Sequence, residues 1–427
     1  MPSLVPRDGQ TIAEYIFSAK VGRRVRAGDV VEVAADVVCF PDLGMHMFRK
    51  AWEPLGVNRV ADPDRVAVVF DHRVPTDSQS TSAMHRYWRK WCADHGVTKL
   101  GDLGTQGISH QWLVERGYAR PGMLVTNLDT HANTTGGVGC FATAVGFGIV
   151  MDLALGVNWH IVPETVRVSL SGSLNAGVLT RDVMHAVNNS LGQDGGIGKA
   201  IEFHGPAVSG MTIDQRMTLC NLTRKVEAMT GLCASDETTQ RWYRDRGLGD
   251  VDQLASDPDA TYEREVSVNL ESVELSVSPP PSAAVAVPLS QVVGTHIDQA
   301  FIGSCAGGRL DDLRAGAAVL RGRKVALGVR LVVAPASQDI YQAALADGTI
   351  ADLAASGAIL APASCGACMG APYGALDDGE ICIATATENY PGRMGSPSAK
   401  TFLASAAIVA ASAIEGCIAD PRPFLVS

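Results

Sequence analysis

Two cysteines in a glycine-rich segment have the spacing in this sequence that most directly suggests chemistry. Cys365 and Cys368 stand three positions apart in APASCGACMGAPYG, residues 361–374, with no His, Asp or Lys beside them. The segment follows an apolar run typical of a strand, so these thiols do not fit the usual interpretation of small buried hydrophobes. A redox pair, half of a zinc site and ligands to another metal group are all open at this point.

A third thiol narrows these alternatives. Cys305 lies in FIGSCAGGRLDDLR, residues 301–314, which is another glycine-rich loop between an apolar run and a helical pattern. A zinc ribbon would need a second C-x-x-C or a His pair, which the chain lacks, and a thioredoxin-like pair would need different flanking residues. Three thiolates for four irons would leave one iron without a protein ligand, and a Lewis-acid catalyst requires such an open position.

The other cysteines are less informative. Ten cysteines are scattered over 427 residues without the dense spacing of a secreted disulfide scaffold. Cys39 and Cys382 lie in strand-like runs, where we expect small buried hydrophobes.

The hydrophobic pattern predicts an α/β fold with mostly parallel sheets, because strand-like and helical runs alternate along the chain. The predicted strands are 65–70, 123–126, 166–170, 329–335 and 358–363, and the predicted helices are 82–96, 309–322 and 399–416. The proline-rich stretch 276–288 cannot hold a helix or a central strand, so it is predicted to be a linker or boundary.

Function in such sheets gathers at the loops that leave the carboxyl ends of strands. Three glycine-rich loops qualify, at residues 127–139, 301–314 and 364–370. Small residues there let backbone N–H groups approach an anionic ligand at a helix N-terminus. A carboxylate, a phosphate or an iron–sulfur cluster would suit that geometry.

Composition limits the partners and the compartment. The formal net charge is −10 and no run of Lys or Arg occurs, which argues against nucleic acid or an anionic membrane as a partner. No stretch approaches the roughly 18–20 consecutive apolar residues of a membrane span, and the first ten residues contain no apolar signal region. We therefore expect a cytoplasmic protein that acts on small molecules or proteins.

Long segments of the chain resemble the aconitase superfamily, specifically the large subunits of 3-isopropylmalate dehydratases and homoaconitases. The resemblance is carried, in family order, by GQTIAEYIF, DHRVPTD, GISHQWLVERGYARPGMLVTNLDTHANTTGGVG, IEFHGPAVSGMTIDQRMTLCNLT, FIGSC, SCGACMG and YPGRMGSPSAKTFLASAAIVAASAIEGCIADPR. These segments extend over nearly the whole sequence.

This resemblance implies an aconitase-like large subunit with three α/β subdomains around a central iron–sulfur cluster. The first subdomain, 1–165, would hold the Asp-His loop (71–72), the Ser-His loop (109–110) and the Asp-Thr-His loop (129–131). The second subdomain, 166–285, would hold the Cys-Asn loop (220–221) and end in the proline-rich linker. The third subdomain, 286–427, would hold the cluster cysteines. It also implies a [4Fe-4S] cluster on Cys305, Cys365 and Cys368, and the reversible dehydration of a hydroxy di- or tricarboxylic acid.

The resemblance further implies two groups of site residues. The catalytic group beside the cluster would shuttle protons and comprises Asp71, His72, His110, Asp129 and His131. Each His alone would more often be structural, but three of them in family-matching loops favour the catalytic interpretation. Asn221 and Arg393 match substrate-binding positions, and the planar guanidinium of Arg393 suits a bidentate carboxylate contact.

The chain also departs from the family pattern. The usual SCTNGR is SCAGGR here, with Ala306 and Gly307, and TTNRNFPGR is TATENYPGR, with Thr387 in place of an Asn. Two charges change sign, because Glu388 stands where the family has Arg and Lys225 stands where it has Glu. We expect both to line one substrate-binding cavity as a compensatory exchange, the alternative being surface charges in loops that have drifted. A carboxylate in the usual pose would then face Glu388, so we expect a substrate altered from 3-isopropylmalate.

Two classes of function follow. The first is an iron–sulfur hydro-lyase that acts on an altered hydroxy acid, and the second is a non-catalytic paralogue with a scaffolding or regulatory role. The retained thiols and catalytic residues favour the enzyme. The resemblance also implies a small-subunit partner, a swivelling-domain protein that supplies the catalytic Ser, because the chain ends at Ser427 soon after the DPR motif. We expect a heterodimer or a dimer of heterodimers.

Overall fold

Three parallel β-sheets form the framework of the molecule. The computed structural model describes residues 9–370 and 372–425. The first sheet has the order β4-β3-β2-β5-β6 and consists of β2 (Val37–Pro41), β3 (Val66–Val69), β4 (Lys99–Gly101), β5 (Leu124–Asn127) and β6 (Phe141–Ala144). Every residue of β2, β3 and β5 is buried, as expected of parallel strands with both faces covered.

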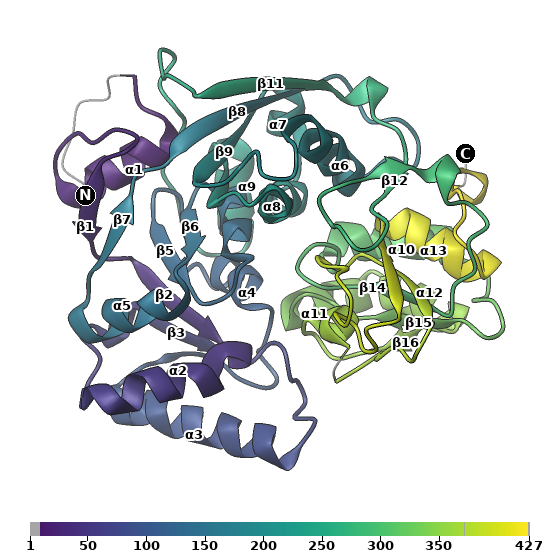
Figure 1. Cartoon of the computed structure of the whole chain (residues 1–427), viewed down its shortest axis with the longest axis horizontal. Helices are drawn as coiled ribbons and strands as arrows, with labels where there is room; N and C mark the ends of the chain where they lie inside the picture. Colours follow the sequence, from purple (N-terminus) through teal and green to yellow (C-terminus); the bar gives the residue numbers. More distant parts are fainter. Residues whose placement is uncertain (1–8, 371, 426–427) are drawn as a thin grey trace.

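The other two sheets follow in sequence. The second has the order β10-β9-β8-β11 and consists of β8 (Glu164–Ser171), β9 (Lys199–His204), β10 (Thr230–Cys233) and β11 (Arg264–Asn269). The third has the order β16-β15-β14-β17-β18 and consists of β14 (Gln299–Ile302), β15 (Arg330–Val333), β16 (Ile359–Leu360), β17 (Ile381–Ala384) and β18 (Lys400–Leu403). The third sheet and its helices form a separate lobe at the right of Figure 1.

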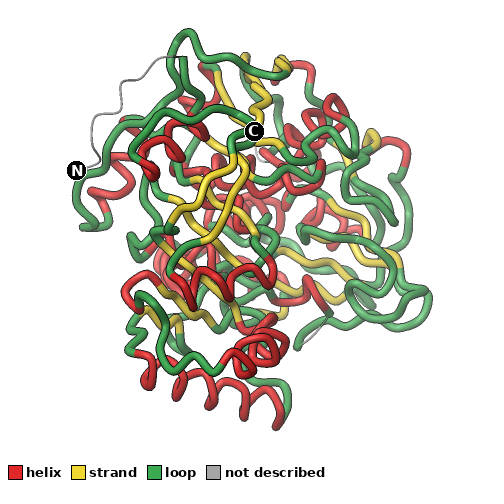
Figure 2. The backbone as a smooth tube through the Cα atoms, turned by 60° about the vertical axis from the view of Figure 1, so that its left-hand side comes forward, coloured by secondary structure: helices red, strands yellow, loops and turns green. Residues whose placement is uncertain are grey.

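Helices and loops surround the strands, as Figure 2 shows. With the first sheet come α1 (Ile12–Val21), α2 (Met45–Trp52), α3 (Gln79–His95), α4 (Ser109–Glu115) and α5 (Ile149–Leu155). With the second come α6 (Thr180–Leu191), α7 (Pro206–Gly210), α8 (Ile213–Leu222) and α9 (Glu237–Asp245). With the third come α10 (Leu310–Leu320), α11 (Gln338–Ala346), α12 (Thr349–Ser356) and α13 (Ala406–Glu415). No helix in the described ranges is long and apolar enough to cross a membrane.

The α/β architecture predicted from the sequence is confirmed, and the predicted strands coincide with β3, β5, β8, β15 and β16. The predicted helices 82–96 and 309–322 coincide with α3 and α10. Trp88 and Trp91 of α3 pack edge-on against Phe40 of β2, with ring centroids 5.1 and 5.6 Å apart. This aromatic contact fixes α3 to the first sheet.

The predicted helix 399–416 is wrong over its first part. Lys400–Leu403 is strand β18, which pairs in parallel with β17, and helix α13 begins only at Ala406. A strand of only four residues was too short to separate from the helical pattern of the alanines that follow. Tertiary pairing with β17 decides the conformation of this segment.

The expected linker and domain boundaries can be placed on this framework. Residues 276–288 hold only β12 (Ser276–Val277) and β13 (Val287–Pro288), a short antiparallel pair outside the main sheets. A second antiparallel pair joins β1 (Val30–Val33) to β7 (Asn158–Ile161). The expected boundary between residues 165 and 166 falls inside β8, because that strand begins at Glu164. The division into three subdomains stays a prediction.

Candidate active site

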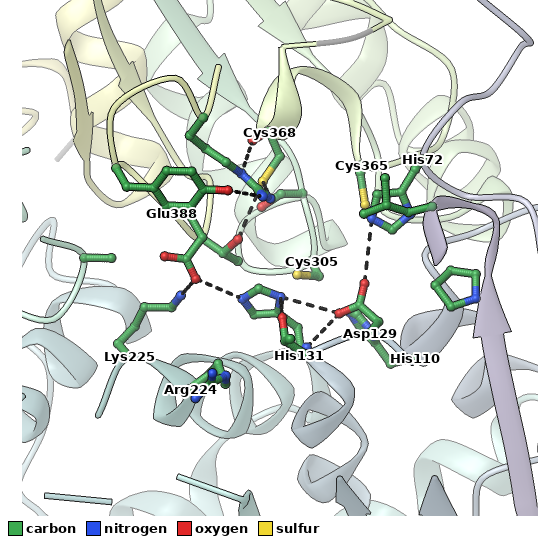
Figure 3. Close-up of a pocket in the computed structure, with 18 of the residues that line it drawn as sticks. His72, His110, Asp129, His131, Arg224, Lys225, Cys305, Cys365, Cys368 and Glu388 are labelled. Carbon is green, nitrogen blue, oxygen red and sulfur yellow. Dashed lines mark hydrogen bonds and ion pairs between the residues drawn. The ribbon is translucent and has the colours of Figure 1, made fainter. Parts of the chain in front are cut away.

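One cavity of about 950 Å³ collects the residues singled out by the sequence. Its lining includes three thiols and three imidazoles, from Cys305, Cys365, Cys368, His72, His110 and His131. The lining also includes charged groups, from Asp129, Arg224, Lys225, Glu227, Glu388 and Arg393. Figure 3 shows most of these side chains pointing toward one another, and they come from all three predicted subdomains.

The loops at the carboxyl ends of parallel strands position most of these groups. His72 follows β3 and His131 follows β5 in the first sheet, whereas Cys305 follows β14 and Glu388 follows β17 in the third. Cys365 comes after the short strand β16. Because strands of one sheet end at the same edge, their loops deliver these side chains to a shared space.

The three thiols are buried on the cavity wall but do not cluster tightly. Among the described residues, the ligand atoms of Asp42, Asp71 and His72 form the group in which all atoms lie within 4.8 Å of one another, and the three Sγ atoms do not meet this distance. The three thiols face one cavity but lie too far apart to bind a single metal ion. Such spacing is consistent with thiolates that each bind a different iron of one cluster. The donor set therefore fits an iron–sulfur group better than a mononuclear metal.

Arg393 contacts one of the thiols directly. Its Nε donates to the carbonyl of Cys368 at 2.8 Å, its Nη2 lies 3.4 Å from Cys368 Sγ, and its Nη1 lies 3.2 Å from the Tyr390 hydroxyl. Burial acts to raise the pKa of Cys368, but the guanidinium of Arg393 opposes this effect and the pKa is lowered. By contrast, burial raises the pKa of Cys365 to about 12. The carboxylate-binding role expected for Arg393 stays a prediction.

His72 is held among three carboxylates. Its Nδ1 lies 2.6 Å from Asp71 Oδ1 and 3.5 Å from Asp42 Oδ1, and its Nε2 faces Asp129 Oδ2 at 3.7 Å. Burial disfavours the charged ring, but the neighbouring Cys365 and Asp71 raise the pKa of His72 well above its ordinary value. The geometry therefore favours an imidazolium that can donate a proton. Asp71 stands behind His72 and does not line the cavity.

Asp42 is a site residue that the sequence analysis missed. It follows β2, the neighbour of β3, and it is fully buried. Its carboxylate accepts the N–H groups of His72 and Arg73, at 2.9 and 3.1 Å, and lies 3.1 Å from His85 Nε2. These contacts fix the loop that presents His72. A carboxylate directly after an apolar, strand-like run was the signal in the sequence that could have found it.

The other two histidines are electrostatically different from His72. Burial lowers the pKa of His110, on α4, to about 3, and neither ring nitrogen has a hydrogen-bond partner. His131 donates its backbone N–H to Asp129 Oδ1 at 2.7 Å, and burial together with Lys225 lowers the pKa of its ring. At neutral pH the cavity therefore holds two neutral imidazoles beside a protonated one.

A family model and curated relatives match this chain over almost its full length. The model "Aconitase family (aconitate hydratase)" matches residues 21–296 and 291–416. The chain belongs to the aconitase family. It is 41% identical over 418 residues to 3-isopropylmalate dehydratase large subunit 1 of Methanopyrus kandleri, covering 98% of this chain and 100% of that one. It is 40% identical over 419 residues to large subunit 2 of Archaeoglobus fulgidus, with coverage of 98% and 100%.

A solved structure shows a weaker likeness. The crystal structure of Thermococcus kodakaraensis aconitase X in its holo-form matches with a TM-score of 0.49 and 11% identity, over 84% of both chains. The family assignment rests on the family model and the sequence relatives. As a member of the aconitase family, the chain is an enzyme of the hydro-lyase type with an aconitase-like α/β fold.

The two charges that depart from the aconitase family pattern meet in the cavity. Lys225, in the turn after α8, donates to Glu388 Oε1, and both residues line the wall (Figure 3). The side chain of Lys225 is only 4% exposed and that of Glu388 is 26% exposed. The same Glu388 oxygen faces His131 Nε2 at 3.7 Å. These are not surface charges in drifted loops, although their role toward a substrate stays a prediction.

The structure explains two further features of the sequence, Gly307 and Asn221. A Cβ atom at Gly307 would lie 2.2 Å from Thr385 Cβ, so Thr385 occupies the space that the family's Asn side chain would need. Asn221 does not line the cavity, and its Nδ2 donates to Thr134 Oγ1 at 2.8 Å. Asn221 thus ties α8 to the loop that follows His131.

Proposed function

We propose that this chain is the large catalytic subunit of an iron–sulfur hydro-lyase that acts on a hydroxy di- or tricarboxylic acid other than 3-isopropylmalate. The observation that carries the proposal is the convergence of three buried thiols and three imidazoles of unlike charge on one cavity. A non-catalytic scaffold would have no evident need of that combination.

Cys305, Cys365 and Cys368 would hold a [4Fe-4S] cluster, whose iron without a thiolate ligand would supply Lewis-acid chemistry. The chain's own residues would handle the protons. His72, held protonated among carboxylates, would donate a proton to the departing hydroxyl group. His110, neutral and without a hydrogen-bond partner, would orient that hydroxyl. Asp129, whose Oδ2 lies 3.7 Å from His72 Nε2, would hold the His72 ring in place.

The ion pair of Lys225 and Glu388 supports the altered substrate. The ammonium of Lys225 is already matched by Glu388, and Arg224 is matched by Glu227 in the same lining. A substrate carboxylate at this wall would meet the Glu388 carboxylate rather than a free cation, and like charges in a desolvated site cost several kcal/mol. The substrate would therefore present a neutral or hydrogen-bond-donating group at this wall.

A small-subunit partner completes the proposal. The relatives are named large subunits, and those names imply a separate small subunit. A swivelling-domain protein of that kind would supply the Ser that removes the carbon-bound proton.

The test is a hydration assay on the assembled enzyme. The chain would be purified without oxygen with its small subunit, loaded with iron and sulfide, and assayed against a panel of unsaturated di- and tricarboxylic acids. We expect hydration of at least one acid, and little or none of the dehydrated form of 3-isopropylmalate. Efficient turnover of 3-isopropylmalate would contradict the altered substrate, and a cluster-loaded complex inert on the whole panel would favour the scaffolding role.

A further inference from the structure

Arg181 is a buried arginine that no part of the proposed chemistry uses. It is the second residue of α6 and only 4% exposed. Its Nη2 atom donates to the carbonyl oxygens of Thr385 and Ala386, at 2.6 and 3.0 Å. No carboxylate oxygen of the described residues lies within 4.0 Å of its guanidinium nitrogens. A buried cation without a contact ion pair is costly and needs an explanation.

The acidic side chains that influence Arg181 act on it without direct contact. Burial lowers the pKa of Arg181 to about 10, and the groups that act against this are Asp312, Asp182, Cys305 and Cys368. Burial also raises the pKa of Asp182 to about 6 and that of Asp312 to about 7. Asp182 is therefore mostly ionised and Asp312 partly ionised at neutral pH, but neither carboxylate makes a contact ion pair with Arg181. The remaining groups near Arg181 are two of the three cavity thiols.

The hydrogen bonds of Arg181 also connect it to the loops of those thiols. The carbonyl of Thr385 accepts a second hydrogen bond, from Ser304 Oγ at 3.1 Å, and Ser304 directly precedes Cys305. Ser304 has a φ of 69°, a strained conformation for a residue other than glycine, so its loop needs such support. Ala386 directly precedes Thr387, whose Oγ1 lies 3.6 Å from Cys368 Sγ.

We propose that Arg181 is the buried counter-cation of the iron–sulfur cluster and a positioning residue for the loops of Cys305 and Cys368. The inference rests on the proposed function, because it requires a cluster at these thiols. A [4Fe-4S] core of charge 2+ with three thiolates carries one net negative charge, and reduction by one electron adds another. A nearby fixed cation stabilises the reduced cluster more than the oxidised one, so Arg181 raises the midpoint potential.

Two substitutions separate charge from hydrogen bonding. Arg181→Lys and Arg181→Gln each keep a donor that can reach toward the carbonyl of Thr385, but only Lys keeps the positive charge. The midpoint potential of the cluster would be measured by redox titration with electron paramagnetic resonance on the reconstituted protein. We expect a more negative potential in Arg181→Gln and a potential close to that of the original protein in Arg181→Lys. Equal shifts in both variants, or none in either, would overturn the role of the charge.

A second measurement does not depend on the potential. Without the cluster, Arg181 lacks its counter-charge, so the Arg181→Gln variant should gain less in Tm on reconstitution than the original protein does. An equal or larger gain, or failure of the Gln variant to fold as apoprotein, contradicts the proposal. If the original protein binds no cluster, the proposed function itself is contradicted. If the protein binds a cluster whose potential and stabilising effect do not depend on Arg181, only this inference is contradicted.

Discussion

Lys225 and Glu388 carry opposite charges on one wall of the cavity, so the behaviour of either depends on the other. Breaking a buried ion pair by removing one partner costs about 3–5 kcal/mol, because an unmatched charge is left behind. The relevant question is therefore the coupling between the two residues rather than the effect of either one.

We predict strong coupling in a double-mutant cycle. Lys225→Glu and Glu388→Arg each place two like charges together, and both should lower the free energy of unfolding. The double variant restores a pair, so its loss should be smaller than the sum of the single losses by about 1–3 kcal/mol. Urea unfolding of the four proteins gives this coupling.

The exposed pair of Arg321 and Asp352 provides the matched control, with side chains 68% and 30% exposed. The exchange Arg321→Asp with Asp352→Arg should show a coupling below about 1 kcal/mol. Additivity at Lys225 and Glu388 within about 0.5 kcal/mol would mean that the two side chains do not interact.

Sequence reasoning reached the cavity residues that stand in recognisable loops, but it missed residues that act through others. His72, His131 and Cys305 each follow a strand inside a motif. Asp42 and Arg181 lie in segments without such a motif, and their importance comes from contacts across the fold, with His72 in one case and with Thr385 in the other. The spacing of residues along the chain does not predict those contacts.

Elements position the site through close backbone packing. The 3₁₀ segment Ala132–Val138, which begins directly after His131, packs against α8, and a Cβ atom at Gly137 would lie 2.5 Å from the backbone nitrogen of Met217. Only a glycine permits this approach. The position of His131 thus depends on a contact between two elements.

We predict that Gly137→Ala lowers the free energy of unfolding by about 3 kcal/mol or more, since neither backbone can yield easily. It should also lower kcat, because displacement of this segment would shift His131, the residue directly before it. Gly210→Ala is the control: nothing lies within 4 Å of a Cβ atom there, so its Tm should stay the same or rise slightly. Equal stabilities of the two variants would show that Gly137 does not pack closely against Met217.

A second element-scale prediction concerns the seam between α4 and α11. Glu115, at the end of α4, accepts hydrogen bonds from Gln111 and Ser337, and burial raises its pKa from 4.5 to about 7. The folded protein therefore holds this proton more tightly than the unfolded chain. The resulting stability is fully present below pH 4.5 and is lost as the pH rises to about 7.

Glu115→Gln should remove this part of the pH dependence. The measurement is urea unfolding at several pH values from 4.5 to 7, and the difference between the original protein and the variant should change steadily across that interval. Glu265→Gln, at an exposed position of β11, serves as the control. A difference that stays constant with pH would mean that Glu115 is ionised in the folded protein throughout.

The limits of sequence reasoning at this scale show in β18. Its four residues precede an alanine-rich helix, and the helical period of that helix extended the prediction backwards over the strand. Strands such as β3 and β5 were predictable because their apolar runs are bounded by turns. The edge position of β18 beside β17 is a property of the sheet and is not encoded in its own four residues.

At the scale of the whole molecule, we expect the chain to need its small subunit. The residues facing the cavity supply imidazoles, carboxylates and thiols, whereas the proposed Ser would come from the partner. The cluster-loaded large subunit alone should show no turnover above background, and addition of the small subunit should restore it in proportion to complex formed. Turnover by rigorously purified large subunit alone would contradict the division of labour.

The central claim is that Cys305, Cys365 and Cys368 bind one iron–sulfur cluster. The most direct test is the iron content and visible absorption of the anaerobically reconstituted protein, compared with its Cys→Ser variants at these positions. Each of the three variants should lose the brown chromophore, whereas Cys39→Ser, at a buried thiol of β2 that does not line the cavity, should keep it. Full iron content and an unchanged spectrum in any of the three variants would contradict the account.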